Sequence, residues 1–150
     1  MTSTTVGRSD APSNGKLLVQ GALAGLAGGL VFGIMMGMMG MLPMVGMLVG
    51  SESAVVGFIV HMVISAFIGA VYGLVIGRFA NTVPVALGGG VANGVVWWVL
   101  GALILMPLML GMSQMVFVIE QAQWMSLLGH IIYGVVTGLA FFALRRNDDS

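Results

Sequence analysis

Four long apolar segments alternate with short polar ones along this chain. They run over residues 17–42, 54–76, 85–106 and 124–144. A helix needs about 20 apolar residues to cross the roughly 30 Å hydrocarbon core of a bilayer, and each segment meets that length. The pattern therefore predicts an all-α membrane protein with four transmembrane helices.

Polar residues frame this helical region at both ends of the chain. Residues 1–15 are rich in Ser and Thr and show no apolar periodicity, so we expect a disordered cytoplasmic N-terminus. The transmembrane domain is expected over residues 16–146, followed by a short cytoplasmic tail over residues 147–150.

Composition agrees with a membrane protein and excludes several functions. Charged residues make up 7% of the chain and apolar residues 59%, whereas a typical soluble domain is about 25% charged. Net charge is zero and the basic residues are scattered, so nucleic-acid binding has no electrostatic basis. The absence of cysteine excludes disulfides, thiolate metal sites and a cysteine nucleophile.

The distribution of charge predicts the orientation in the membrane. Four spans place both termini and the link between the second and third helices on one side. Those segments hold every basic residue of the chain, namely Arg8, Lys16, Arg78, Arg145 and Arg146. The other two loops hold Glu52 and Glu120 and no basic residue. Since basic loops stay inside, we expect an inner-membrane protein with both termini cytoplasmic.

The second outer loop, residues 107–123, has its own apolar pattern. Met109, Met112, Val116 and Ile119 recur at near-helical spacing with polar residues between them. This spacing predicts a short helix lying in the membrane interface.

The two halves of the chain, residues 17–78 and 85–146, resemble each other. At offsets of 64 and 69 the matched positions are Gly25 with Gly89, Gly37 with Gly101, Pro43 with Pro107, His61 with His130 and Gly69 with Gly138. The match predicts a duplicated helical hairpin. Both hairpins begin on the inner side, so the repeats are parallel and any pseudo-twofold axis runs along the membrane normal.

Small residues recur every fourth position in the first, second and fourth helices. In lipid, helices attract each other mainly through close van der Waals approach, which small residues one turn apart permit. The residues predicted to pack helices are Gly25, Gly29, Gly33, Gly37, Gly69, Gly73, Gly134 and Gly138.

Two histidines are the ionisable residues that lie well inside the predicted spans. His61 and His130 each lie on a small-residue stripe, about seven residues or roughly 10 Å from the outer interface. Such residues are functional candidates by default, and Glu52 and Glu120 precede them by nine and ten residues. These four residues form the candidate ligand or polar site. The alternative is that each neutral imidazole only hydrogen-bonds a neighbouring helix.

Methionine gives a second chemical signal. Apart from Met1, all of the methionines fall in the outer half or the outer loops. Thioether sulfur and imidazole suit a soft cation such as Cu(I). The candidate ligands are His61, His130, Met35, Met39, Met62, Met106 and Met109. The alternative is that methionine fills gaps or forms an adaptable surface for another membrane subunit.

The order of histidines and glycines resembles the haem-binding bundle of the cytochrome b family. In that family, histidines on the second and fourth helices hold the porphyrin and glycines on the first and third make room. Here His61 and His130 occupy those helices, with Gly33, Gly37 and Gly101 at matching depth. The resemblance covers helix order and residue type only, and one histidine per helix would allow one haem b.

No catalytic motif stands out, so we expect a non-enzymatic protein. The favoured function is an accessory or interaction component in the lipid bilayer, without a cofactor, as a homo-oligomer or with another membrane subunit. A copper-type carrier or transporter is the first alternative, and a mono-haem electron carrier is the second.

Overall fold

The protein is all-helical over the residues that the structure, a computed structural model, describes: 11–148 and 150. The elements in chain order are α1 (Asn14–Met38), α2 (Leu42–Gly46), η1 (Met47–Val49), α3 (Ala54–Val75), α4 (Val83–Trp97), η2 (Trp98–Leu105), α5 (Met106–Met109), η3 (Ser113–Met115) and α6 (Gln121–Asp148). No strand occurs within the described part of the chain.

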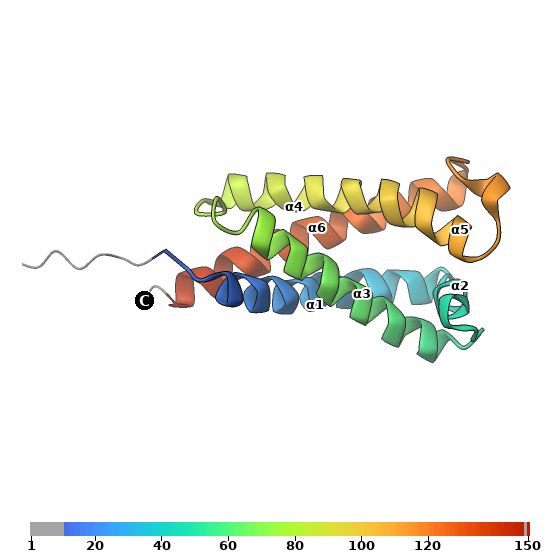
Figure 1. Cartoon of the computed structure of the whole chain (residues 1–150), viewed down its shortest axis with the longest axis horizontal. Coiled ribbons are helices and arrows are strands. Elements are labelled where there is room, and N and C mark those ends of the chain that lie inside the picture. Colours follow the sequence, from blue (N-terminus) through green and yellow to red (C-terminus); the bar gives the residue numbers. More distant parts are fainter. Residues whose placement is uncertain (1–10, 149) are drawn as a thin grey trace, which may run out of the picture.

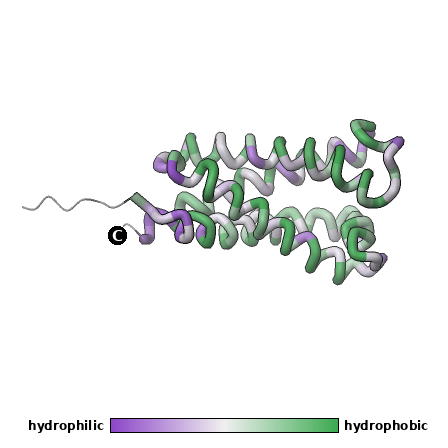
Figure 2. Tube along the Cα trace, viewed as in Figure 1, coloured by the Kyte–Doolittle hydropathy of each residue, from purple (hydrophilic) through white to green (hydrophobic). Residues whose placement is uncertain are grey.

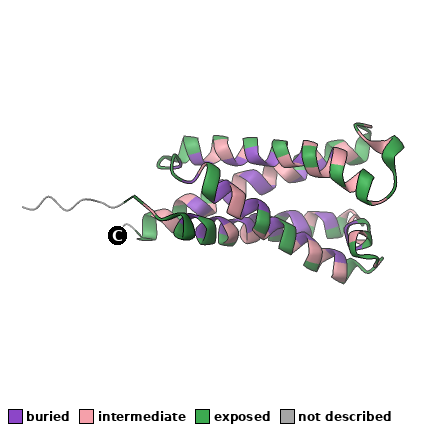
Figure 3. Cartoon of the chain, in the orientation of Figure 1, coloured by how far each residue is buried: buried purple, intermediate pink, exposed green. Residues whose placement is uncertain are grey.

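Four of the helical stretches are long and apolar enough to cross a membrane. They are α1, α3, the continuous stretch Val83–Met109 and α6. Figure 2 shows apolar residues along their length and polar residues gathered toward the ends of the bundle. Many large apolar residues are exposed, among them Val55 and Phe67, and Figure 3 shows exposed residues along the outside of the helices. The prediction of four helices of membrane-spanning length is confirmed.

The four long helices form one elongated bundle (Figure 1). The start of α1, the link between α3 and α4 and the C-terminus lie at one end, hereafter the terminal end. The short helices α2 and α5 lie at the opposite end, hereafter the α2/α5 end.

Local sequence signals explain where the helices begin and end. Ser13 and Ser53 cap α1 and α3 through side-chain oxygens that accept backbone N–H bonds of 3.2 and 3.4 Å. Pro84 lies in the first turn of α4, where its missing N–H costs nothing. The first helix ends at Met38 instead of residue 42, because Gly40 takes a left-handed conformation at φ +69°.

Glycines bring the helix backbones into direct contact at two crossings. A Cβ at Gly69 would overlap the Gly21 carbonyl oxygen, where α1 crosses α3. A Cβ at Gly134 would overlap the Gly90 carbonyl oxygen, where α4 crosses α6. The helix α1 also packs against α6, whereas contacts between α3 and α4 are sparse.

Most of the predicted packing glycines lie at these crossings. Those whose Cβ would overlap a neighbouring helix are Gly25, Gly29, Gly33, Gly69, Gly73, Gly134 and Gly138. At Gly33 the overlap is with the Phe58 ring of α3, whereas a Cβ at Gly37 would make only an ordinary contact with Leu42. The prediction missed the α4 side of the second crossing, although Ala86, Gly90 and Gly94 show the same four-residue spacing.

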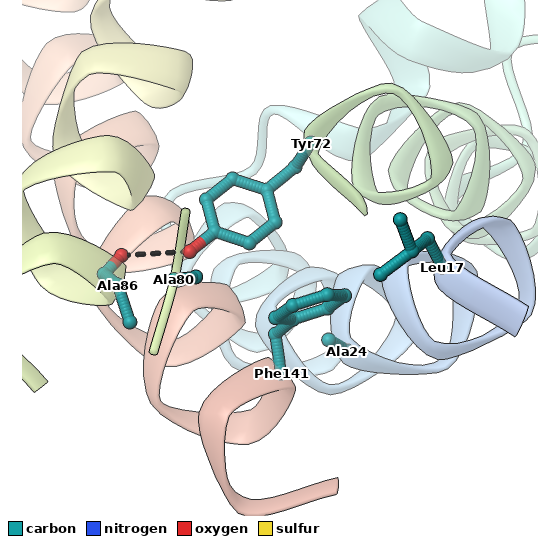
Figure 4. Close-up of a cluster of buried hydrophobic side chains, with 6 residues drawn as sticks. All are labelled: Leu17, Ala24, Tyr72, Ala80, Ala86 and Phe141. Carbon is teal, nitrogen blue, oxygen red and sulfur yellow. Dashed lines mark hydrogen bonds between the residues drawn. The ribbon is translucent and has the colours of Figure 1, made fainter. Parts of the chain in front are cut away.

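An apolar core fills the terminal end of the bundle (Figure 4). Its fully enclosed residues include Leu17 of α1, Tyr72 of α3 and Phe141 of α6. The Tyr72 hydroxyl donates a 2.8 Å hydrogen bond to the Ala86 carbonyl, and the Phe141 ring meets the Tyr72 ring edge-on. The hydroxyl bond ties α3 to the start of α4, where few other contacts join them.

The loops at the α2/α5 end differ from the predicted interface helix. Residues 107–123 hold the end of α5, the single turn η3 and an irregular stretch instead of one continuous helix. Left-handed conformations at Gly111 (φ +72°) and Phe117 (φ +58°) interrupt the helical path. The first loop holds an additional short helix, α2, whose Leu42 carbonyl lies directly against Gly57 of α3.

Candidate functional site

A cavity of about 350 Å³ lies inside the bundle toward the α2/α5 end. Side chains from α1, α2, η1, α3, α4, η2, α5 and α6 line it, and most of them are apolar or aromatic. Its polar lining residues are His61, Ser65, Ser126, His130 and Tyr133. Among the described residues that line it, none is Lys, Arg, Asp or Glu.

His61 reaches the neighbouring helix because α1 has no side chain in its way. Gly29 and Gly33 face α3 at this level, and His61 Nε2 lies 2.9 Å from the Gly29 carbonyl oxygen. The Ser65 hydroxyl lies 3.4 Å from the same nitrogen. The small-residue stripe thus positions this imidazole against a backbone carbonyl of α1.

His130 makes its hydrogen bond within its own helix. Its Nδ1 lies 2.8 Å from the carbonyl oxygen of Ser126, one turn earlier in α6, with the Ser126 hydroxyl at 3.4 Å. The two histidines are therefore equivalent in sequence but not in their hydrogen bonds. The structural alternative predicted for the histidines, a hydrogen bond to a neighbouring helix, describes His61 and not His130.

Phe32 of α1 lies between the two imidazoles. Its ring centroid is 5.3 Å from that of His61 and 5.0 Å from that of His130, with edge-on geometry in both cases. Gly129 makes this position available, because a Cβ there would overlap the Phe32 ring. Sequence reasoning missed Phe32, although it lies three residues after Gly29 in the packed helix.

Tyr133 connects the two helices that carry the histidines. Its hydroxyl donates a 2.7 Å hydrogen bond to the Ser65 carbonyl of α3. The side chain is almost fully enclosed, so this bond holds the wall of the cavity between α3 and α6 in place.

Methionines from both halves of the chain meet at the cavity. The predicted ligands Met106 and Met109 line it, whereas Met35, Met39 and Met62 do not. Three further methionines that the prediction omitted also line the cavity, namely Met36, Met41 and Met44. Met36 could have been found from its position one helical turn after Phe32.

The structure does not bring the two glutamates to the histidines. Glu52 and Glu120 are exposed in the loops and are absent from the cavity lining. Within the described part of the chain, no group of three or more His, Cys, Asp or Glu side chains could hold a metal ion.

The three glycines expected to make room for a haem have different surroundings, and not all of them border open space. Gly33 is packed against Phe58 and His61, and Gly37 lies near Leu42. Only Gly101 borders open space, since a Cβ there would meet nothing within 4 Å. Phe32 contacts both imidazoles, and side chains occupy the space predicted for a porphyrin beside Gly33.

Exposed lining residues mark where the cavity opens. Phe67 of α3 and Leu105 of η2 are 60% and 48% exposed, and Met109 of α5 and Met44 of α2, at the α2/α5 end, are 64% and 47% exposed. At this opening the Phe67 ring meets the Trp97 ring edge-on, with centroids 5.9 Å apart. In a membrane, the part of the opening beside Phe67 and Leu105 would face the lipid.

These features define an all-helical protein with four helices of membrane-spanning length and an internal, uncharged cavity. Comparison with protein-family models, with curated proteins and with solved structures finds no match to this chain.

Proposed function

We propose that this chain is a non-enzymatic membrane protein that acts as a binding or accessory component by taking a small lipid-soluble molecule into its cavity. The observation that carries the proposal is the 350 Å³ uncharged cavity with two imidazoles in its wall. Ligand sites are typically concave, mostly apolar and equipped with a few polar groups that orient the ligand.

The sideways opening supports the membrane as the source of the ligand. Phe67, Leu105 and Met109 surround it with apolar surface, so a lipid-soluble molecule can enter without crossing water. Dissolved ions and sugars would lose their hydration shells at such an opening without compensation.

Two glycines on the same transmembrane stretch allow a matched test. Gly101 borders the cavity and Gly88 faces outward, and a Cβ at either position meets nothing within 4 Å. Gly101→Leu should fill the cavity without disturbing helix packing, whereas Gly88→Leu should leave it open.

The measurement is quenching of tryptophan fluorescence by 1-bromonaphthalene in mild detergent, because Trp97 lines the cavity. We expect saturable quenching in the parent protein and in Gly88→Leu, and at least a tenfold weaker response in Gly101→Leu. Equal saturable quenching in both variants would contradict the proposal.

A soft cation is the second candidate ligand, and the convergence of methionines favours it. Five methionine side chains and two imidazoles line one cavity, and Cu(I) accepts both ligand types. The test is competition for Cu(I) with a chelator. Affinity should fall in the double variant Met106→Leu/Met109→Leu and hold in Met35→Leu/Met39→Leu, whose methionines lie outside the cavity.

We further propose that the protein lies in the inner membrane with both termini cytoplasmic. Four of the five basic residues gather at the terminal end, where Lys16 pairs with Asp148 at 3.3 Å, Arg78 bonds Asn14 and Arg145 bonds the Gly77 carbonyl. Arg8 lies outside the described residues. Reporter fusions after Ser150 and within residues 51–53 should report opposite sides.

The proposed duplication gains support from the two helix crossings. Gly25 approaches Ser65 and Gly69 as Gly90 approaches Gly134 and Gly138. These contacts match at offsets of 65 for the first helix of each hairpin and 69 for the second. The first offset differs by one from the 64 predicted, so Gly25 corresponds to Gly90 and not to Gly89, which faces Ile76. Assembly as a homo-oligomer or with another membrane subunit remains part of the same proposal.

A further inference from the structure

The hydrogen bonds of the two imidazoles determine which chemistry they offer to a ligand. A backbone carbonyl oxygen can only accept, so His61 Nε2 and His130 Nδ1 must carry the protons in their bonds to Gly29 and Ser126. A neutral imidazole has one N–H and one bare nitrogen. The bare nitrogens are then His61 Nδ1 and His130 Nε2, and both accept hydrogen bonds.

The surroundings favour the neutral form of both rings. Among the described residues, none that lines the cavity is a carboxylate that could pair with an imidazolium. An unpaired charge in an apolar cavity is costly. Both rings therefore present acceptors to the cavity and have no second N–H to donate.

Neither bare nitrogen is among the fully buried side-chain atoms that lack a partner. The fully buried polar atoms without a partner in the described residues are Gln20 Oε1, Asn93 Nδ2 and Thr137 Oγ1. The imidazole nitrogens are not among them, although no hydrogen bond to His61 Nδ1 or His130 Nε2 is present in the described part of the chain. Because both histidines line the cavity, each bare nitrogen can accept a hydrogen bond from a ligand O–H that reaches it.

The other polar groups of the cavity do not change its preference for ligands that donate a hydrogen bond. The Tyr133 hydroxyl already donates to the Ser65 carbonyl at 2.7 Å. The serine hydroxyls of Ser65 and Ser126 can donate or accept, so they do not discriminate between ligands.

The apolar walls suit a flat ring. Phe32 lies between the imidazoles, and Trp97 and Phe67 meet edge-on at the opening. Aromatic side chains stack on or meet the edges of ligand rings at favourable energy. An alkyl or isoprenoid tail attached to such a ring can leave through the opening between α3 and η2.

We infer that the cavity selects neutral, lipid-soluble aromatic alcohols of the phenol or quinol class, whose O–H donates to a bare imidazole nitrogen. This inference rests on the proposed function and specifies its ligand. Carboxylates, ammonium groups and aromatic compounds without an O–H should bind more weakly.

Two probes that differ in a single methyl group test the inference. 4-Octylphenol and its methyl ether, 4-octylanisole, share ring and tail, but only the phenol can donate a hydrogen bond. Each is used to displace 1-bromonaphthalene from the full chain, with a metal chelator present. One neutral hydrogen bond predicts that the phenol binds about five- to tenfold more tightly.

His130 provides the variant, because its hydrogen bond lies within α6 and its loss leaves the contact between α1 and α3 intact. The preference for the phenol should fall in His130→Leu, fall to about onefold in His61→Leu/His130→Leu, which removes both acceptors, and persist in Gly88→Leu. If His130→Leu fails to fold, the comparison of the two probes in the parent protein still tests the inference.

The outcomes separate this inference from the proposed function. Displacement by both probes with equal affinity in the parent protein would overturn the selection of hydroxyl groups and leave a binding cavity in place. Failure of both probes to displace 1-bromonaphthalene would overturn the inference and count against the proposed function, which the Gly101→Leu comparison tests independently.

Discussion

Individual glycines decide how closely the helices of this bundle approach. At Gly69 the Cβ of any other residue would overlap the Gly21 carbonyl oxygen and the backbone of Gly25. Backbone cannot move aside as a flexible side chain can, so the helices would have to separate. In lipid this removes the close contact that holds them together.

Gly69→Val should therefore lower the free energy of unfolding by about 1–3 kcal/mol, the usual cost of overpacking. The measurement is SDS-induced unfolding in mixed micelles, followed by circular dichroism. Gly88→Val is the matched control and should change stability little, because its Cβ meets nothing within 4 Å. Equal loss in both variants would show that the crossing is not the cause.

Two tyrosines make comparable hydrogen bonds at different levels of the bundle, Tyr72 at the terminal end and Tyr133 near the middle. Tyr72 donates to the Ala86 carbonyl and Tyr133 to the Ser65 carbonyl, at 2.8 and 2.7 Å. Tyr72→Phe and Tyr133→Phe should each cost about 1 kcal/mol in the same unfolding assay. Binding of 1-bromonaphthalene should change only in Tyr133→Phe, because Tyr72 is not part of the cavity lining. An effect of Tyr72→Phe on binding would show that the terminal end of the bundle also contributes to ligand binding.

At the scale of elements, the sparse contact between α3 and α4 distinguishes this bundle from one closed on all sides. Both helices pack strongly against other partners, α3 against α1 and α4 against α6. The stretch η2 that continues α4 is a π-helix, a conformation often found at functional sites. The opening of the cavity lies between α3 and this stretch.

A cross-link across the opening should trap the cavity in a closed state. The chain has no cysteine, so Phe67→Cys/Gly101→Cys would carry the only two thiols, one on α3 and one on η2, and would keep Trp97 as the fluorescent reporter. After reaction with a short bis-maleimide, the association rate of 4-octylphenol, measured by its displacement of 1-bromonaphthalene, should fall at least tenfold. The same variant without the reagent is the control, and an unchanged rate would place the entrance elsewhere.

At the scale of the whole molecule, the two hairpins meet largely through α1 and α6. A Cβ at Gly28 of α1 would overlap the Thr137 hydroxyl and approach the Tyr133 carbonyl of α6. Helices in membranes are commonly stable one by one and associate afterwards. Because the contact between α1 and α6 holds the hairpins together, their association should not require the covalent connection between α3 and α4.

Residues 1–81 and 82–150, expressed together as separate chains, should therefore copurify. Gly28→Leu in the first fragment should abolish copurification, because it separates α1 from α6. Gly88→Leu in the second fragment is the control and should leave it intact. Recovery of the complex with Gly28→Leu would show that other contacts join the hairpins.

Sequence alone determined the number, approximate length and apolar character of the long helices. Hydropathy and four-residue spacing are properties of one segment at a time, so they can be read without knowing its neighbours. The same local information placed His61 and His130 on packed helix faces. It failed at residues 107–123, where left-handed conformations at Gly111 and Phe117 break an otherwise helical spacing.

Only the tertiary structure decided what surrounds the histidines. The hydrogen bond of His61 to Gly29, the position of Phe32 between the imidazoles and the opening beside Phe67 all depend on how distant segments cross. The same crossings turn Met36 toward the cavity and leave Met35 outside it. Spacing along one helix shows on which face of the helix a residue lies. The way two helices cross determines which residues that face contacts.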